Sequence, residues 1–156
     1  MANVEVKKLT PVDIDQFIEL IHVFEEVFEM KSFRLPNIGH LQTLLQKDLF
    51  FVFVAIANRK VVGGLTAYTL EQYYSELPVV YIYDLAVKTA LQRSGIGTSL
   101  ISALTAYCKE RGVQEVFVQA DVADGYALDF YRSTGATSED VVHFTYLLHE
   151  AKGSNQ

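Results

Sequence analysis

A glycine-containing turn between a strand and a helix constrains this chain more than any other feature. Residues 79–87 are apolar on both faces apart from Asp84, which predicts a buried strand. Gln92, Gly95 and Gly97 follow, and apolar residues then recur at helical spacing up to Cys108. At such a junction the first backbone N–H groups of the helix lack partners, and glycine lets a ligand approach the backbone closely. The turn can therefore hold a phosphate, and a pyrophosphate is the natural occupant.

The same glycines would also suit an ordinary turn, where they serve the backbone dihedrals. The turn lacks the Lys-Ser/Thr pair of a Walker loop and the third glycine of a dinucleotide fingerprint. Strand, Gln-x-x-Gly-x-Gly and helix, in that order, resemble the acyl-CoA pyrophosphate motif of the GNAT superfamily of acetyltransferases. The resemblance implies acetyl-CoA as co-substrate. It places the acyl-CoA site on Leu85, Ala86, Val87, Gln92, Arg93, Ser94, Gly95, Ile96, Gly97 and Thr98.

Length and composition predict a single domain. The chain has 156 residues, half of them hydrophobic, which is enough for one sizeable core. We expect the domain to span residues 1–150 and residues 151–156 to be a disordered tail. The single cysteine, Cys108, excludes an internal disulfide and is expected to pack in the core. Neither a leader nor a membrane span is apparent, so a soluble cytoplasmic protein is expected.

The charges are segregated along the chain. Net charge is −6, and residues 61–87 and 112–131 contain acids but neither Lys nor Arg. This argues against a nucleic-acid partner, because phosphates require a basic surface. The acidic stretches are either an ordinary solvated surface or a cleft that concentrates a cationic substrate. The basic residues near the glycine turn suit an anionic cofactor: Lys88, Arg93, Lys109 and Arg111.

The remaining pattern predicts a mixed α/β fold. Strands are expected over residues 4–9, 49–57, 61–70, 79–87, 113–120 and 141–148. Helices are expected over 11–29, 37–48 and 124–133, and from the glycine turn to Gly112. A right-handed crossover through the last of these makes strands 79–87 and 113–120 parallel. The resemblance implies the GNAT acyl-CoA N-acyltransferase fold, with a mostly antiparallel sheet, a splayed central parallel strand pair and flanking helices.

A second segment carries the resemblance further. Residues 127–135 match A-x-x-x-Y-x-x-x-G of the GNAT superfamily, with Tyr131 at the tyrosine, although this pattern alone equally suits a core aromatic. Residues 81–87, 118–121 and 142–144 resemble the gentamicin-type aminoglycoside 3-N-acetyltransferases, and this similarity runs from about residue 51 to 148. Departures at residues 91–94 and 122–125 leave the substrate less defined than the fold.

The chemistry of acetyl transfer assigns roles to two of these residues. The amine must be neutral, the thioester carbonyl needs a donor, and the leaving thiolate needs stabilising. Asp84 is a candidate base or an anchor for a substrate ammonium; alternatively it is a buried acid bonded to backbone or a tyrosine. A backbone N–H near Leu85 would hold the carbonyl, and Tyr131 would donate to the departing sulfur.

The acceptor site is expected to hold a small cationic amine. His143 is a possible second base or a histidine that packs within a strand, and the four histidines show no metal-ligand spacing. An aminoglycoside is the favoured acceptor; the alternatives are a polyamine or other small amine, or a GNAT-like module that binds acyl-CoA without turnover. Many relatives dimerise through sheet edges, so a homodimer is also considered. The predicted acceptor-site residues are Tyr83, Asp84, Asp121, Asp124 and His143.

Overall fold

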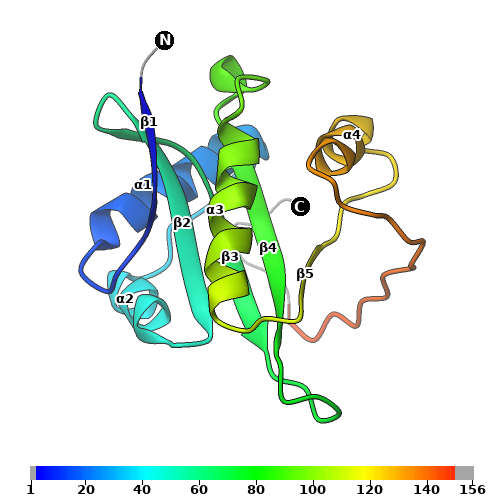
Figure 1. Ribbon diagram of the computed structural model, residues 1–156. Helices are drawn as coiled ribbons and strands as arrows, with labels where there is room; N and C mark the ends of the chain where they lie inside the picture. The colour runs from blue at the N-terminus through cyan, green and yellow to red at the C-terminus, as the bar shows by residue number, and fades with distance from the viewer. Residues whose placement is uncertain (1–2, 150–156) are drawn as a thin grey trace.

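The computed structural model describes residues 3–149 of the chain (Figure 1). Its elements follow the order expected from the sequence as far as the last helix. They are β1 (Val4–Lys8), α1 (Ile14–Val27), α2 (Ile38–Gln46), β2 (Phe50–Ala57), β3 (Lys60–Leu70), β4 (Val79–Val87), a 3-10 turn (Thr89–Leu91), α3 (Ile96–Glu110), β5 (Glu115–Val118) and α4 (Gly125–Ser133).

These strands form one mixed sheet in the order β1-β2-β3-β4-β5. Neighbouring strands are antiparallel except β4 and β5, which are parallel and joined through α3. The predicted GNAT fold class is therefore confirmed. The parallel pairing runs only from Val79 opposite Glu115 to Ile82 opposite Val118. Because β4 continues to Val87, its second half has no β5 neighbour, and this is the predicted splay.

The sheet is buried on both faces, so the molecule has two hydrophobic clusters. On one face α3 contributes Leu100 and Leu104, which pack with Phe53 of β2. On the other face α1 contributes Leu20, which packs with Val52. Figure 1 shows α3 on one side of the sheet and α1 and α2 on the other. Because β2 is covered on both sides, its sequence is a continuous run of apolar residues.

A β-bulge interrupts β4 at its centre. Thr66 of β3 pairs with Asp84, whereas the next residue of β3, Ala67, pairs with Ile82, so Tyr83 is the extra residue on β4. Ile82 and Leu85 both pack in the cluster under α3. The two residues between them, Tyr83 and Asp84, are therefore directed to the opposite face.

The predicted strand over residues 141–148 is wrong. The structure forms neither a strand nor a helix there, and each of these residues is exposed. Apolar side chains alternate along this segment, which indicated a strand with one covered face. However, no segment within residues 3–149 forms a strand pair with residues 141–148. β5 is also shorter than the predicted 113–120.

None of the described helices is long and apolar enough to cross a membrane.

Candidate active site

The turn before α3 is held by its own side chains. Gln92 donates from Nε2 to the carbonyl oxygen of Val87 at 3.0 Å and so ties the turn to the end of β4. Ser94 donates from Oγ to the carbonyl oxygen of Leu91 at 2.5 Å. Arg93 and Gly95 adopt left-handed backbone conformations, with φ of 63° and 91°. These contacts and dihedrals fix the path of the backbone into the helix.

The first turn of α3 is an uncapped helix N-terminus. No side chain caps Gly95, the residue before the helix. The first backbone hydrogen bond runs from Ser99 N–H to the carbonyl oxygen of Gly95. The N–H groups of Ile96, Gly97 and Thr98 consequently have no backbone acceptor among the described residues. Three free N–H groups at the positive end of a 15-residue helix provide an anion site.

Gly95 and Gly97 favour glycine for different structural reasons. A side chain at Gly95 would meet open space, but the positive φ there favours glycine. A Cβ on Gly97 would lie 2.8 Å from two ring carbons of Phe130. Gly97 therefore allows α3 and α4 to approach each other, and close access for a phosphate is not needed to explain it.

A cavity of about 610 Å³ opens beside this turn. Its walls come from the second half of β4, the turn and first residues of α3, α4, and the end of α1. Its volume suits a small-molecule or cofactor site. Ten of the residues predicted from the sequence line it: Leu85, Ala86, Val87, Gln92, Arg93, Gly95, Gly97, Thr98, Asp124 and Tyr131.

The cavity also includes residues that the sequence did not indicate. Val27 and Phe28 at the end of α1 form one wall, and Tyr126 of α4 forms another. The Arg93 guanidinium lies over the Tyr126 ring at 4.9 Å from its centroid, so these two side chains join the turn to α4. Periodicity predicted α1 only as an amphipathic helix, and periodicity alone did not place the end of that helix at this cavity.

Tyr131 keeps its proton over the physiological pH range. Burial raises the pKa of its hydroxyl to about 12, and the negative charges of Asp84 and Asp124 contribute to the increase. Their influence indicates that both carboxylates lie near this hydroxyl. A full proton transfer to a thiolate with a pKa near 8.5 would be uphill by about 5 kcal/mol. Tyr131 is thus suited to donate a hydrogen bond rather than to give up its proton.

Asp84 does not line the cavity, but its charge acts on Tyr131, which does. No cation pairs with it among residues 3–149, and burial raises its pKa from the usual 3.8 to about 6. At neutral pH the carboxylate is mostly ionised, but it accepts a proton far more readily than an ordinary aspartate.

An aromatic row lies beside Asp84. We use this name for Tyr68, Tyr83, Tyr81 and Phe117, which come from β3, β4 and β5. The Tyr83 ring packs edge-on against those of Tyr68 and Tyr81, with centroids 5.8 and 6.0 Å away. Tyr81 stacks on Phe117 at 4.9 Å. Tyr83 is 59% exposed. Ring faces beside a carboxylate can interact with a cation.

The other predicted acceptor residues are not all brought together. Asp124 lines the cavity and also caps α4, because its carboxylate accepts from Ala127 N–H at 3.0 Å. Asp121 is exposed and accepts from Ala123 N–H at 2.9 Å, which supports the turn before α4. His143 is exposed in the segment after α4 and does not line the cavity. Two residues of the predicted acyl-CoA site do not line the cavity either: Ile96 is buried, and Ser94 is exposed in the turn.

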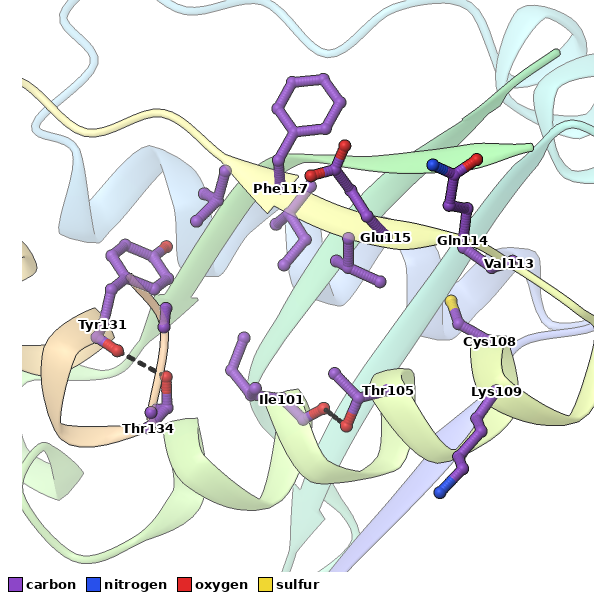
Figure 2. Close-up of a pocket in the computed structure, with 15 residues that line it drawn as sticks. Ile101, Thr105, Cys108, Lys109, Val113, Gln114, Glu115, Phe117, Tyr131 and Thr134 are labelled. Atoms are coloured by element: carbon purple, nitrogen blue, oxygen red, sulfur yellow. Dashed lines mark hydrogen bonds between the residues drawn. The ribbon is translucent and has the colours of Figure 1, made fainter. Parts of the chain in front are cut away.

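A second cavity of about 360 Å³ lies on the other side of Tyr131, between α3, β5 and the end of α4 (Figure 2). Ile101, Thr105 and Cys108 of α3 line it. Thr134 also lines it and donates from Oγ1 to the Tyr131 carbonyl oxygen at 2.6 Å. Burial raises the pKa of Cys108 to about 11, so this thiol stays protonated. Within the described residues no three His, Cys, Asp or Glu side chains are grouped to hold a metal.

Solved structures share this fold. An aminoglycoside acetyltransferase from an uncultured soil metagenomic sample, solved with sisomicin, is 55% identical, with a TM-score of 0.92 over 94% of this chain and 97% of its own. A second one, also from an uncultured soil metagenomic sample, is 34% identical, with a TM-score of 0.88 over 94% and 99%. An aminoglycoside N-acetyltransferase solved in complex with CoA is 15% identical and shares the fold, with a TM-score of 0.78 over 96% and 97%.

Sequence comparisons agree with the structural ones. An uncharacterised N-acetyltransferase of Methanocaldococcus jannaschii is 26% identical over 140 residues, which are 88% of this chain. The match spans 62% of the length of that curated relative. Residues 14–136 match the acetyltransferase (GNAT) family, and they include the glycine turn, the β4 bulge and Tyr131. The chain belongs to the GNAT family of acetyltransferases.

Proposed function

We propose that this protein transfers an acetyl group from acetyl-CoA to an amine of an aminoglycoside, at the 3-amino group of the deoxystreptamine ring. The observation that supports this proposal most is that an acidic face lies next to an acyl-CoA-type turn. The β4 bulge directs Asp84 and Tyr83 to one face, and the cavity beside the turn reaches Tyr131. The likeness at 55% identity to an aminoglycoside acetyltransferase solved with sisomicin supports the choice of acceptor.

The cofactor half of the proposal uses the turn and the splayed strand. The N–H groups of Ile96, Gly97 and Thr98 would bind the pyrophosphate, and Arg93 adds a positive charge beside them. From Tyr83 onward the edge of β4 that faces away from β3 lacks a strand neighbour in the described chain. The pantetheine amides can pair with this edge as an added strand would.

The chemical half of the proposal uses Asp84 as the base and Tyr131 as a hydrogen-bond donor to the thioester sulfur. Asp84, directly or through water, would take the proton from the ammonium and release the neutral amine for attack on the thioester carbonyl carbon. A backbone N–H near Leu85 would hold the carbonyl oxygen as it becomes negative. The C–S bond then breaks, the attacking nitrogen gives up its second proton through water to the departing sulfur, and Tyr131 would donate a hydrogen bond to that sulfur. The proton on Asp84 returns to solvent.

Electrostatics favour a cationic acceptor over a neutral one. Asp84 and Asp124 both raise the pKa of Tyr131, so their negative potentials overlap at the reacting end of the cavity. The aromatic row adds ring surface beside Asp84. An acceptor with several ammonium groups and apolar ring faces can satisfy both features. A polyamine would satisfy the first feature but has no ring to stack against the second.

The deciding experiment is a thiol-release assay with acetyl-CoA and three acceptors: sisomicin, spermidine and a monoamine. We expect kcat/KM to be highest for sisomicin, and NMR of the product should place the acetyl group on the 3-amino nitrogen. Preference for spermidine would replace the aminoglycoside with a polyamine. Acetyl-CoA binding without turnover on any of the three would favour the non-catalytic module.

A further inference from the structure

Among the described residues, Arg93 is the only basic residue that lines the cavity beside the glycine turn. Asp124 and Asp129 line the same cavity. Within residues 3–149, however, neither carboxylate forms an ion pair with the Arg93 guanidinium. The guanidinium carries five N–H donors in a plane and stays charged at all physiological pH values. It can therefore bind an anion that enters this cavity.

Tyr126 holds one face of this guanidinium. The centroid of the Tyr126 ring lies 4.9 Å from the Cζ atom of Arg93, which is the distance of a cation–π contact. Tyr126 belongs to the first turn of α4, and Asp124 caps this turn by accepting from Ala127 N–H. The ring is thus attached to a well-formed helix end. It covers a face of the guanidinium, so the N–H groups at the edge stay available to a ligand.

The backbone of Arg93 is in a conformation that few residues with a side chain adopt. Its φ is 63°, in the left-handed region, where glycine fits without strain. A residue persists in such a conformation when contacts around it hold it there. The contact with Tyr126 is made by the end of the side chain, which glycine would lack. The combination indicates that the side chain of Arg93, rather than its backbone, has a role in the turn.

The free N–H groups of the first turn of α3 lie in the same part of the cavity. The N–H groups of Ile96, Gly97 and Thr98 have no backbone acceptor among the described residues. Gly97 and Thr98 line the cavity together with Arg93. An anion held by these N–H groups would therefore lie beside the guanidinium. A guanidinium binds two oxygens of a phosphate at once when its N–H groups are correctly oriented.

We propose that Tyr126 is a positioning residue, which holds the Arg93 guanidinium beside the first turn of α3 for the pyrophosphate of acyl-CoA. This inference rests on the proposed acyl-CoA donor and adds a residue that acts through another one. A free arginine side chain loses rotamer freedom when it binds a phosphate. The Tyr126 ring restricts the side chain before the cofactor arrives, so less freedom is lost on binding.

The first test is calorimetry of CoA binding to a set of four variants. Arg93→Gln should raise the dissociation constant about 20-fold, because it removes a charged hydrogen-bond donor. Tyr126→Leu should raise it about fourfold, the size of an exposed cation–π contact. Tyr126→Phe keeps the ring and should stay within twofold of the wild type. In the double variant Arg93→Gln with Tyr126→Leu, the second substitution should add less than 1.5-fold.

Arg111→Gln is the matched control for the loss of a stacked guanidinium. Arg111 lies over the Tyr107 ring at 4.8 Å, but it follows the last residue of α3, roughly 20 Å from the glycine turn. It should leave CoA affinity unchanged. A fourfold loss from Tyr126→Leu that persists beside Arg93→Gln would mean that the ring contacts CoA directly. Tighter binding by Tyr126→Leu would mean that the ring competes with the phosphate. Either result would overturn the positioning role.

The second test identifies the group that the guanidinium binds. Dephospho-CoA lacks the 3′-phosphate, and 4′-phosphopantetheine also lacks the nucleoside and one phosphate of the pyrophosphate. Arg93→Gln and Tyr126→Leu should weaken binding of both ligands, as they do for CoA. A loss confined to CoA would assign Arg93 to the 3′-phosphate, and a loss that is absent only for 4′-phosphopantetheine would leave the nucleoside or the second phosphate. Each of these two results would contradict a contact with the phosphate beside pantetheine.

The outcomes separate this inference from the proposed function. Normal CoA binding by the wild type and by Tyr126→Leu would overturn the positioning role and leave acetyl transfer from acetyl-CoA untouched. A wild type that binds no CoA would instead overturn the proposed donor, and the role of Tyr126 with it.

Discussion

The two halves of the proposed active site, one for acyl-CoA and one for the acceptor, are built in different ways. The acyl-CoA half comes largely from one continuous stretch, from the end of β4 through the glycine turn into α3, and Gln92 ties its ends together. The acceptor half comes from β3, β4, β5 and α4, and it depends on a bulge and on the packing of α4 against α3. A local turn is specified by its own residues, whereas an assembled surface depends on every element that positions it. Substitutions should therefore separate cofactor binding from acceptor chemistry.

Asp84→Asn should have the largest effect. Removing the base should lower kcat about 1000-fold with every acceptor, while the acetyl-CoA dissociation constant stays within about twofold. Steady-state kinetics and calorimetry measure the two quantities. Asp121→Asn is the matched control, because Asp121 is exposed and supports only the turn before α4. A loss of acetyl-CoA binding in Asp84→Asn would mean that the two halves are not separable.

Tyr131→Phe should lower kcat by about 100-fold, since it removes one hydrogen-bond donor to the thiolate and keeps the ring. Tyr107→Phe is a suitable control, because Tyr107 lies on α3 against Phe51 and Phe53, away from the cavity. Unchanged kcat in Tyr131→Phe would assign this tyrosine to packing alone. Equal losses in both variants would point to a general effect on stability.

Gln92→Ala should act on the other half. Without the hydrogen bond to Val87 the turn is less well fixed, and we expect the acetyl-CoA dissociation constant to rise about tenfold. At saturating acetyl-CoA, kcat should change little. Gln72→Ala is the control, because Gln72 makes similar side-chain hydrogen bonds in the connection before β4. Similar acetyl-CoA affinity for the two variants would show that acetyl-CoA binding does not need the hydrogen bond from Gln92 to Val87.

Tyr83→Ala should give the smallest effect. It removes an exposed ring of the aromatic row, and the sisomicin KM should rise about fivefold with kcat nearly constant. Tyr73→Ala is the control, since Tyr73 is 98% exposed in the connection between β3 and β4. If both variants raise KM equally, the aromatic row has no special part in acceptor binding.

The same contrast explains what the sequence could and could not predict. The glycine turn, the parallel strand pair and the position of Tyr131 follow from spacing within short segments, and the structure brings ten of the predicted residues to one cavity. The β4 bulge was not predicted, because Tyr83 and Asp84 alternate normally in the sequence and only the register with β3 reveals the extra residue. The contact between Gly97 and Phe130 likewise joins residues 33 positions apart.

The error at residues 141–148 has a different cause. Hydrophobic periodicity indicates that one face of a segment is suited to burial, but it does not identify the neighbouring strand or helix that would cover this face. Val142 and Phe144 belong to a strand pattern, yet both are exposed and no strand of the described residues pairs with them. A pattern can thus indicate a buried face where the structure leaves that face exposed.

The central claim is that Asp84 is the base, and the dependence of kcat/KM on pH tests it most directly. The ionised carboxylate is the active form, so wild-type activity should fall as the pH drops through the pKa of Asp84, about 6. The ionisation of the substrate amine also changes kcat/KM with pH, but this contribution is the same for the wild type and for Asp84→Asn. With sisomicin, we therefore expect the plot of log kcat/KM against pH to be steeper by one unit in the wild type than in Asp84→Asn below this pKa. The same slope in both proteins would contradict this assignment, because it would show that the reaction does not need the ionised Asp84 carboxylate.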